Sequence, residues 1–414
     1  MRAARLRPSA RLLSAACVAL ALSVAACAPN VREPAPRPQP AARMPAPAPA
    51  MEQPLAMPES AGPERRAATS GNRVALLLPL SGQHAALGSA MLEAAQMAVL
   101  DAGRSPRGSD MTLVPVDTGG TAEGAEAAAR TALDDGASLI LGPLFSHAVA
   151  AAAGPAQERG VALIAFTNDA GAAREGVFVM GLLPGSQVRR VVAEAGAGGG
   201  KRFSVLAPAS AYGQRGAQAA EDAIPLAGGQ LVAVEYYDPG GADSQETARR
   251  LARQPVDFVV LPEAPQRAVT LAPLYAYYET RGARAKFLGT QLWDDPTMWR
   301  EPALYGAWFA APPAQARTAF MERFAALHGR PPPRIAALPY DAAALAVALS
   351  RRPGGPDFSV EAIAQPNGFT GVEGLFRFRR DGLSERAMDI LEIRRGQPPT
   401  VIRPAPTSFD DRPS

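Results

Sequence analysis

Cysteine and histidine are scarce in this sequence of 414 residues, which contains two cysteines and three histidines. Two cysteines cannot form the disulfide framework of a small secreted domain, and three dispersed histidines argue against a histidine-based metal site. We therefore expect no metal and no other bound cofactor. The 38 glycines and 41 prolines make up less than a fifth of the chain, which is too little for a protein that is disordered throughout.

An excess of charge of one sign is also missing, because 42 basic residues stand against 39 acidic ones. The small surplus lies at the start: residues 1–66 hold nine arginines and four glutamates, which leaves a net charge of −2 on the other 348 residues. Nucleic-acid-binding domains carry a basic surface, so we predict no nucleic-acid partner. The chain is longer than domains that fold around a single hydrophobic core usually are, which predicts two packed units.

Long apolar runs that would cross a membrane are absent from the N-terminal region. The run from Leu12 to Ala26 has 15 residues, too few to span a bilayer at about 1.5 Å per residue. Arginines precede it and small residues end it, which predicts a signal peptide over residues 1–26. The end of the run, Val24 to Cys27, resembles the bacterial lipobox, in which the cysteine is acylated; an ordinary cleavage site with an incidental cysteine is the alternative. Because Ala28 follows, the resemblance implies anchoring in the outer membrane, with the protein in the periplasm.

Residues 27–70 are rich in proline and alanine and show no apolar periodicity. Eleven prolines lie between Pro29 and Pro63. Such a segment cannot bury a core and favours the extended polyproline II conformation. At about 3.1 Å per residue it would reach at most roughly 130 Å from a membrane anchor. We predict a tether, with a passive spacer as the simplest alternative.

From residue 73 onward, short apolar strands alternate with amphipathic helices. The predicted strands cover 73–79, 111–117, 138–142, 161–165, 202–207, 230–236, 256–261 and 286–289, followed by a strand pair at 374–378 and 387–394. The predicted helices cover 85–102, 121–134, 146–159, 187–195, 212–223, 244–253, 266–280, 314–328 and 338–350. This alternation predicts an α/β fold with parallel strands covered by helices on both faces.

Open parallel sheets bind ligands at the carboxyl ends of their strands, and here those loops carry mainly hydroxyl and amide groups. The motifs in order are Leu78-Pro79-Leu80-Ser81-Gly82, Asp117-Thr118-Gly119-Gly120, Leu141-Gly142-Pro143-Leu144, Ala211-Tyr212-Gly213, Tyr237-Asp238-Pro239-Gly240, Leu288-Gly289-Thr290 and Pro339-Tyr340-Asp341-Ala342. Together they resemble the type I periplasmic ligand-binding proteins of the branched-chain amino-acid binding kind. The resemblance implies two doubly wound parallel-sheet lobes joined by a three-crossing hinge. Lobe one would comprise 72–183 plus 310–352, lobe two 186–308 plus 366–396, and 397–414 would be a loose tail.

The same resemblance implies a set of residues that line a ligand cleft. Ser146, Thr167 and Asp169 match positions that bind the ligand carboxylate and ammonium, although Ser146 is equally interpreted as a plain helix N-cap. Tyr212 matches a tyrosine that stacks on the ligand, with simple packing as the alternative. Gln291 stands where amino-acid receptors place an acidic residue, and a neutral amide cannot offset a buried ammonium. Ser81 and Trp293 complete the predicted cleft.

No nucleophile–base set is evident, and Gly196 to Arg202 lacks the residues of a phosphate-binding Walker loop. We therefore predict a protein that is not an enzyme and that binds a small polar ligand or a partner protein. The outer-membrane signal, the tether and Gln291 favour a lipoprotein that resembles the penicillin-binding protein activators and regulates peptidoglycan synthesis by docking on a peptidoglycan synthase. The alternative is the solute receptor of an ABC importer, whose partner would be an ABC permease.

Overall fold

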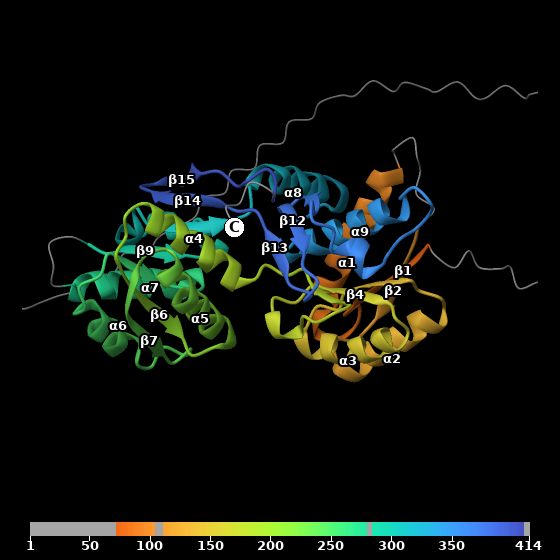
Figure 1. Cartoon of the computed structure of the whole chain (residues 1–414), viewed down its shortest axis with the longest axis horizontal. Helices are drawn as coiled ribbons and strands as arrows, with labels where there is room; N and C mark the ends of the chain where they lie inside the picture. Colours follow the sequence, from red (N-terminus) through yellow and green to blue (C-terminus); the bar gives the residue numbers. More distant parts are fainter. Residues whose placement is uncertain (1–71, 104–110, 280–283, 410–414) are drawn as a thin grey trace, which may run out of the picture. The chain divides into compact units, whose positions relative to one another are not determined.

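The computed structural model describes residues 72–103, 111–279 and 284–409 (Figure 1). The predicted signal peptide, Cys27 and the tether lie outside these residues. Within them, no helix combines the length and the apolar character that a membrane span requires. The two lobes described below belong to one compact unit of the chain.

The first lobe is built around five parallel strands in the order β2-β1-β3-β4-β5. The strands are β1 (Arg73–Leu78), β2 (Thr112–Asp117), β3 (Leu139–Leu141), β4 (Ala162–Ala165) and β5 (Val177–Val179). The helices are α1 (Ala85–Gly103), α2 (Ala122–Asp134), α3 (Ser146–Glu158), α8 (Ala314–His328), α9 (Ala337–Ser350) and α10 (Val360–Ile363). Strand β1 shows why the sheet is covered twice: Val74 and Leu76 pack with α1 and α9, whereas Ala75 and Leu77 pack with α2 and α3.

The second lobe contains a seven-stranded sheet in the order β15-β14-β10-β9-β8-β6-β7. The strands are β6 (Arg202–Pro208), β7 (Gln230–Tyr237), β8 (Phe258–Val260), β9 (Lys286–Gly289), β10 (Trp308–Ala311), β14 (Asp389–Arg394) and β15 (Gln397–Arg403), and the helices are α4 (Pro184–Ala197), α5 (Ala211–Leu226), α6 (Ser244–Ala252) and α7 (Pro265–Tyr278). Phe203 and Val205 of β6 pack with α4 and α5, and Leu206 packs with α6 and α7. The doubly wound, mainly parallel α/β fold is thus confirmed in both lobes.

A third sheet of antiparallel strands corrects the predicted lobe boundaries. It consists of β11 (Phe369–Gly371), β12 (Gly374–Phe378) and β13 (Ser384–Arg386). Phe376 and Phe378 join the core of the first lobe, so this part of 366–396 belongs to lobe one and only β14 belongs to lobe two. The predicted pairing of the strands at 374–378 and 387–394 is wrong, because β12 pairs with β11 and β13.

The predicted loose tail also differs from the structure. Residues Gln397–Arg403 form β15, which pairs antiparallel with β14 at the edge of the second sheet. Pro398 and Pro399 hid this strand in the sequence, but an edge strand tolerates proline because one side of it donates no ladder hydrogen bonds. Phe409 is buried, with 5% of its surface exposed, so the chain stays packed up to that residue.

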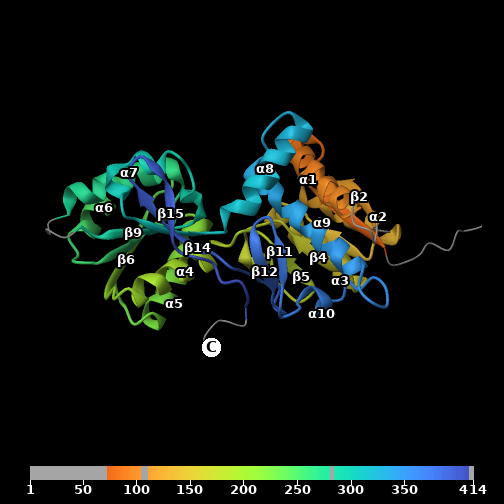
Figure 2. The same ribbon diagram turned by 90° about the horizontal axis from the view of Figure 1, so that it is seen from above.

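The chain passes between the lobes three times in the described residues. It leaves the first lobe after β5, near Leu183, and returns after β10, near Pro313; it leaves again between β13 and β14. Helix α8 follows the second crossing and lies beside α1 (Figure 2). Phe320 and Phe324 of α8 pack with buried residues of α1. This connectivity agrees with the three crossings that the resemblance implied.

Candidate functional site

A cleft with a cavity of about 490 Å³ lies at the carboxyl ends of β3, β4, β6 and β9. Its apolar lining comes from both lobes and consists of Leu87, Leu144, Phe145, Phe166, Leu182, Leu292, Ile335 and Leu338. Its polar lining consists of Ser146, His147, Thr167, Asn168, Tyr212, Gln291 and Arg334. A cavity of this size suits one small ligand with an apolar body and a few polar groups.

The wall from the first lobe is formed by the loops after β3 and β4. Ser146 is the first residue of α3, and Phe145 occupies the N-cap position without a side-chain cap bond, so the interpretation of Ser146 as the N-cap is wrong. The first N–H groups of a helix lack intrahelical partners and favour an anion. Thr167 is 6% exposed, and its Oγ1 accepts a hydrogen bond from the Asp169 backbone N–H at 3.1 Å.

The wall from the second lobe presents a tyrosine and an amide. Tyr212 is the second residue of α5, and its hydroxyl donates to Thr290 Oγ1 at 2.9 Å. Burial raises the pKa of Tyr212 to about 12, so its hydroxyl is neutral at physiological pH. Gln291 begins the 3₁₀ helix η3 (Gln291–Trp293), and its backbone N–H donates to Gln187 Oε1 at 2.9 Å.

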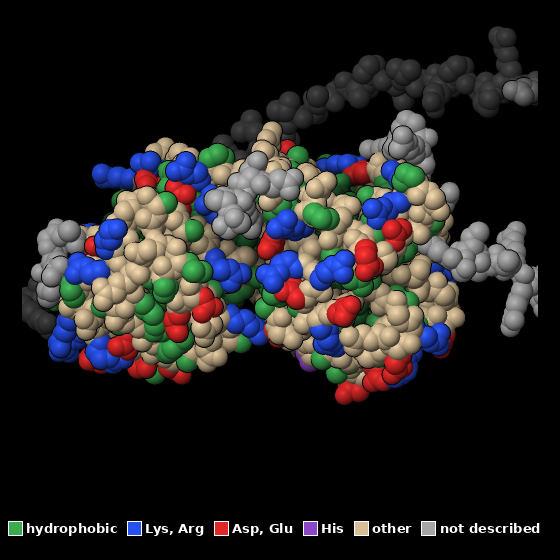
Figure 3. Space-filling view, viewed as in Figure 1, with side chains coloured by type: hydrophobic (Ala, Val, Ile, Leu, Met, Phe, Trp, Pro, Cys, Tyr) green, Lys and Arg blue, Asp and Glu red, His purple; other side chains and the backbone are tan. Residues whose placement is uncertain are grey.

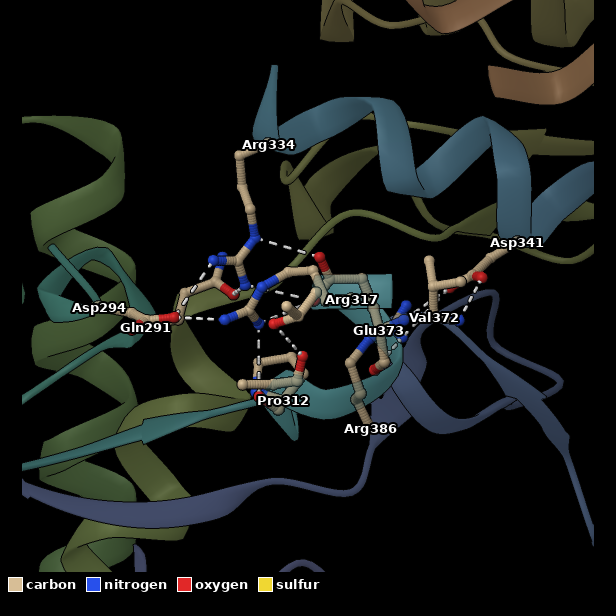
Figure 4. A network of polar contacts seen from close by, with 11 residues as sticks. Gln291, Asp294, Pro312, Arg317, Arg334, Asp341, Val372, Glu373 and Arg386 are labelled. Atoms are coloured by element: carbon tan, nitrogen blue, oxygen red, sulfur yellow. Dashed lines mark hydrogen bonds and ion pairs between the residues drawn. The ribbon is translucent and has the colours of Figure 1, made fainter. Parts of the chain in front are cut away.

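Arg334, which sequence analysis missed, supplies the one guanidinium of the described cleft lining. It begins η6 (Arg334–Ala336) in the first lobe and reaches Gln291 Oε1 at 3.4 Å (Figure 4). Its Nε also donates to Glu373 Oε1 at 3.1 Å, and its Nη1 lies 3.6 Å from Asp294 Oδ2. No local motif identifies this arginine, because it is preceded only by a run of prolines. Its partners Glu373 and Asp294 are distant in sequence and come close to it only in the folded protein.

Behind Arg334, Arg317 extends the same network of charges. Its Nη2 donates to Asp294 Oδ2 at 2.5 Å, and its Nη1 lies 3.8 Å from Glu373 Oε2. The side chains of Glu373 and Arg317 are buried, whereas those of Arg334 and Asp294 are partly exposed. The two carboxylates and the two guanidinium groups compensate each other's charge. This network holds the cleft end of η6 against the loop after β9.

Three predicted cleft residues do not line the cavity. The Asp169 carboxylate accepts from Arg215 Nη2 at 2.5 Å and from the Gly171 N–H at 2.8 Å, so it is committed to a contact between the lobes. Trp293 is fully buried, and its Nε1 donates to the Glu263 carbonyl at 3.1 Å. Ser81 is exposed, and its N–H donates to Asp117 Oδ1 at 3.2 Å. The structure brings together the other four, Ser146, Thr167, Tyr212 and Gln291.

Comparison with known proteins identifies the family to which this fold belongs. The sequence profile described as periplasmic binding protein matches residues 72–398. The chain belongs to the periplasmic binding protein family. No match was found among the curated proteins compared with it. The family's description names the periplasm, which agrees with the predicted location. The anchor in the outer membrane stays a prediction.

Several solved structures share the fold of this family member. A Rhodospirillum rubrum protein assigned to branched-chain amino acid ABC transport has 23% identity and a TM-score of 0.71, with 80% of this chain and 100% of that chain covered. The branched-chain amino acid transporter substrate binding protein LivJ of Streptococcus pneumoniae, in complex with isoleucine, has 20% identity and a TM-score of 0.56, with 81% and 100% covered. An ABC transporter solute binding protein of Rhodopseudomonas palustris, in complex with benzoate, has 18% identity and a TM-score of 0.57, with 82% and 98% covered.

Proposed function

We propose that this periplasmic binding protein is a non-catalytic receptor whose cleft selects a small carboxylate that carries no ammonium group. The observation that carries the proposal is the charge of the cleft lining, which among the described residues includes Arg334 and no aspartate or glutamate. An anionic group would meet the free N–H groups at the start of α3 and the Arg334 guanidinium, which also pairs with Glu373 and Asp294, whereas an ammonium would meet no carboxylate in the described lining.

The arrangement around Arg334 gives the carboxylate a defined place. The first turn of α3, which begins at Ser146, offers backbone N–H groups and the positive end of the helix dipole. The apolar lining, including Phe145 and Phe166, would hold a hydrocarbon or aromatic body. The benzoate complex of the Rhodopseudomonas palustris protein is consistent with such a ligand on this fold.

An amino acid fits less well because its ammonium needs a compensating carboxylate. Asp169, the nearest candidate by sequence, is held by Arg215 at 2.5 Å, and Asp294 is held by Arg317 at 2.5 Å. Breaking either pair to serve a ligand would leave a guanidinium uncompensated in a partly buried place. A neutral amide at Gln291 can accept a hydrogen bond but cannot replace the missing charge.

A matched pair of ligands tests this selectivity. Hexanoate and norleucine share the carbon skeleton and the carboxylate, and they differ by the ammonium group. We expect calorimetry on the purified protein to show binding of hexanoate or benzoate and none of norleucine or leucine. Micromolar binding of leucine or norleucine, with no binding of either simple carboxylate, would overturn the proposal.

We further propose that the receptor acts in peptidoglycan synthesis as an outer-membrane lipoprotein, with a peptidoglycan synthase as its partner. The supports are the lipobox-like end at Cys27 and the proline-rich residues 27–70, which would carry the domain away from the membrane. Import is the second candidate, because the similar structures from Streptococcus pneumoniae and Rhodopseudomonas palustris are ABC transporter binding proteins.

Shortening the tether distinguishes the two roles. Deleting residues 34–63 should abolish activity in cells and leave binding of the purified protein to the synthase intact, because the segment would supply reach and no contacts. Replacing the same residues with a Gly/Ser segment of equal length is the control and should restore activity. Unchanged cell-wall synthesis after deletion of the whole protein, with loss of carboxylate uptake, would instead identify the importer receptor.

A further inference from the structure

A second cavity, of about 810 Å³, lies beside the crossings between the lobes and shares no lining residue with the ligand cleft. Its walls come from α4, from the chain between β12 and β14 around β13, and from the residues after β15. Figure 3 shows basic side chains gathered at the centre of this face, where α4 and β13 lie in Figure 1. We call this cavity the crossing pocket.

Four arginines and one glutamate give the crossing pocket a positive lining. The glutamate, Glu385, is already engaged by Arg377, whose Nη2 lies 2.7 Å from Glu385 Oε2. Arg377 lies outside the lining, and Glu385 Oε1 also lies 4.0 Å from Arg379 Nη1, so this one carboxylate is shared between two arginines and the lining keeps an excess of positive charge. Of the lining arginines, Arg379 pairs with Asp381 at 2.5 Å and more weakly with Glu385 at 4.0 Å. Arg190 donates to the Met388 carbonyl at 3.3 Å and to Glu194 Oε2 at 3.5 Å.

Arg189 stands out because it has no hydrogen-bond or ion-pair partner among residues 72–103, 111–279 and 284–409. It projects from the first half of α4 and is exposed. Partial burial and the neighbouring Arg379 guanidinium lower the pKa of Arg189, more than the carboxylates of Asp222 and Glu385 raise it. Like charges that face each other across a cavity create a local excess of positive potential, which an anion would relieve.

Arg386 adds a buried guanidinium to the wall of the crossing pocket. It is 6% exposed and lines the crossing pocket. Its Nη1 donates to the Glu373 carbonyl at 2.8 Å, and its guanidinium lies over the Phe376 ring at 4.9 Å. Its buried Nη2 has no hydrogen-bond partner in the described part of the chain. A buried guanidinium N–H without an acceptor is destabilising. The charge of Arg386 is partly compensated, because its Nη1 lies 4.0 Å from Asp341 Oδ2, so Arg386 adds an incompletely bonded cation behind the pocket wall.

The rest of the lining is apolar and comes from Leu183, Ala193, Leu383, Met388, Pro404 and Pro406. We propose that the crossing pocket binds a phosphate group carried on a short apolar body. A phosphomonoester carries about −1.5 to −2 charges at neutral pH and three acceptor oxygens, and a phosphodiester headgroup carries one charge on two tetrahedrally placed oxygens. Both can accept from several guanidinium donors at once. The pocket would thus be a second ligand site, separate from the carboxylate cleft.

Soluble probes test the proposal by calorimetry on the full-length protein. Hexyl phosphate represents a free phosphomonoester, inorganic phosphate lacks the apolar body, and dihexanoylphosphatidylglycerol represents a lipid headgroup. We expect hexyl phosphate to bind more tightly than inorganic phosphate, with an affinity that falls as NaCl rises from about 50 to 300 mM. Tighter binding of the phosphatidylglycerol would assign the pocket to a lipid headgroup, and tighter binding of hexyl phosphate to a free phosphomonoester; both support the shared chemistry.

One variant and one matched control make the test specific. Arg189→Gln removes an exposed arginine without a partner and should weaken hexyl phosphate binding about tenfold or more, since a charge-assisted hydrogen bond is lost. Arg253→Gln removes another exposed arginine, at the end of α6 and outside the pocket, and should leave affinity unchanged. No binding of hexyl phosphate at millimolar concentration, or equal binding by wild type and Arg189→Gln, would overturn the proposal. So would competition of hexyl phosphate with hexanoate for one site.

Discussion

Replacing Gly142 with alanine should damage the loop that carries Phe145 and Ser146 into the ligand cleft. Gly142 follows β3 and has φ +89°, a conformation that residues with a Cβ rarely adopt. A Cβ added there would lie 2.2 Å from the Leu77 carbonyl oxygen. Leu77 is fully buried in β1, so its backbone has no room to retreat and the substituted loop must move instead.

The expected loss can be worked out in two parts. A left-handed backbone costs an alanine about 1–2 kcal/mol, and forcing a methyl group into filled space costs about 1–3 kcal/mol more. Gly136→Ala is the matched control, because Gly136 has φ +84° and a Cβ there meets nothing within 4 Å. We therefore expect a loss of unfolding free energy of about 2–5 kcal/mol for Gly142→Ala and about 1–2 kcal/mol for Gly136→Ala.

Urea unfolding separates these outcomes when two signals are followed. All three tryptophans, Trp293, Trp299 and Trp308, lie in the second lobe, so their fluorescence reports that lobe, whereas far-UV circular dichroism reports both. The circular dichroism midpoint should fall further for Gly142→Ala than for Gly136→Ala, and hexanoate affinity should fall in Gly142→Ala alone. Equal midpoints for the two variants would refute the steric argument.

Three further predictions concern the anchor, the cleft and a buried acid. Cys27→Ala should move the protein from the membrane fraction to the soluble fraction without unfolding it; persisting membrane association would contradict lipidation at Cys27. Ser146→Ala should lower hexanoate affinity several-fold and leave the urea midpoint within about 0.5 kcal/mol of wild type; a large change in the midpoint with no change in affinity would point to a purely structural serine. Burial raises the pKa of Asp341 to about 6, although the Arg386 guanidinium partly offsets this rise. Because the pKa of Asp341 is higher in the folded protein than in the unfolded chain, the protonated carboxyl stabilises the fold below about pH 4, and this stabilisation is lost as the pH rises through about 6. The unfolding free energy of wild type should therefore fall, relative to that of Asp341→Asn, between pH 4 and 6.5, and parallel pH profiles would exclude this shift.

Local sequence patterns determined most of the regular elements. The predicted strand at 286–289 and helix at 314–328 agree residue for residue with β9 and α8. Thr121, predicted to begin a helix, is the N-cap of α2 and accepts a hydrogen bond from the Gly124 N–H. These features depend on neighbours a few residues away, so apolar periodicity and capping chemistry contain the information.

Short strands and their partners were decided by the tertiary structure. Strands β5 and β10 have three and four residues and were not predicted. Periodicity cannot identify so short a strand, and the equally short β9 was predicted only because it continues the strand–helix alternation along the chain. The antiparallel β14 and β15 at the sheet edge, and the packing of Phe376 in the first lobe, depend on pairing between segments far apart in the chain. No local sequence pattern indicates whether an apolar segment will be buried in the core of the first or of the second lobe.

The cleft shows the same division. The sequence, through its resemblance to a known family, predicted that Ser146, Thr167, Tyr212 and Gln291 line one cleft, and the structure brings these four together. Within each sheet the strands end at a common edge, but only folding brings the edges of the two sheets to one cavity. The sequence did not determine which charges these residues would meet. Folding brings Arg334 into the cleft and commits Asp169 to Arg215, since an ion pair depends on the approach of two segments that are separate in sequence. The charge of the cleft, and with it the ligand class we propose, was decided by the tertiary structure.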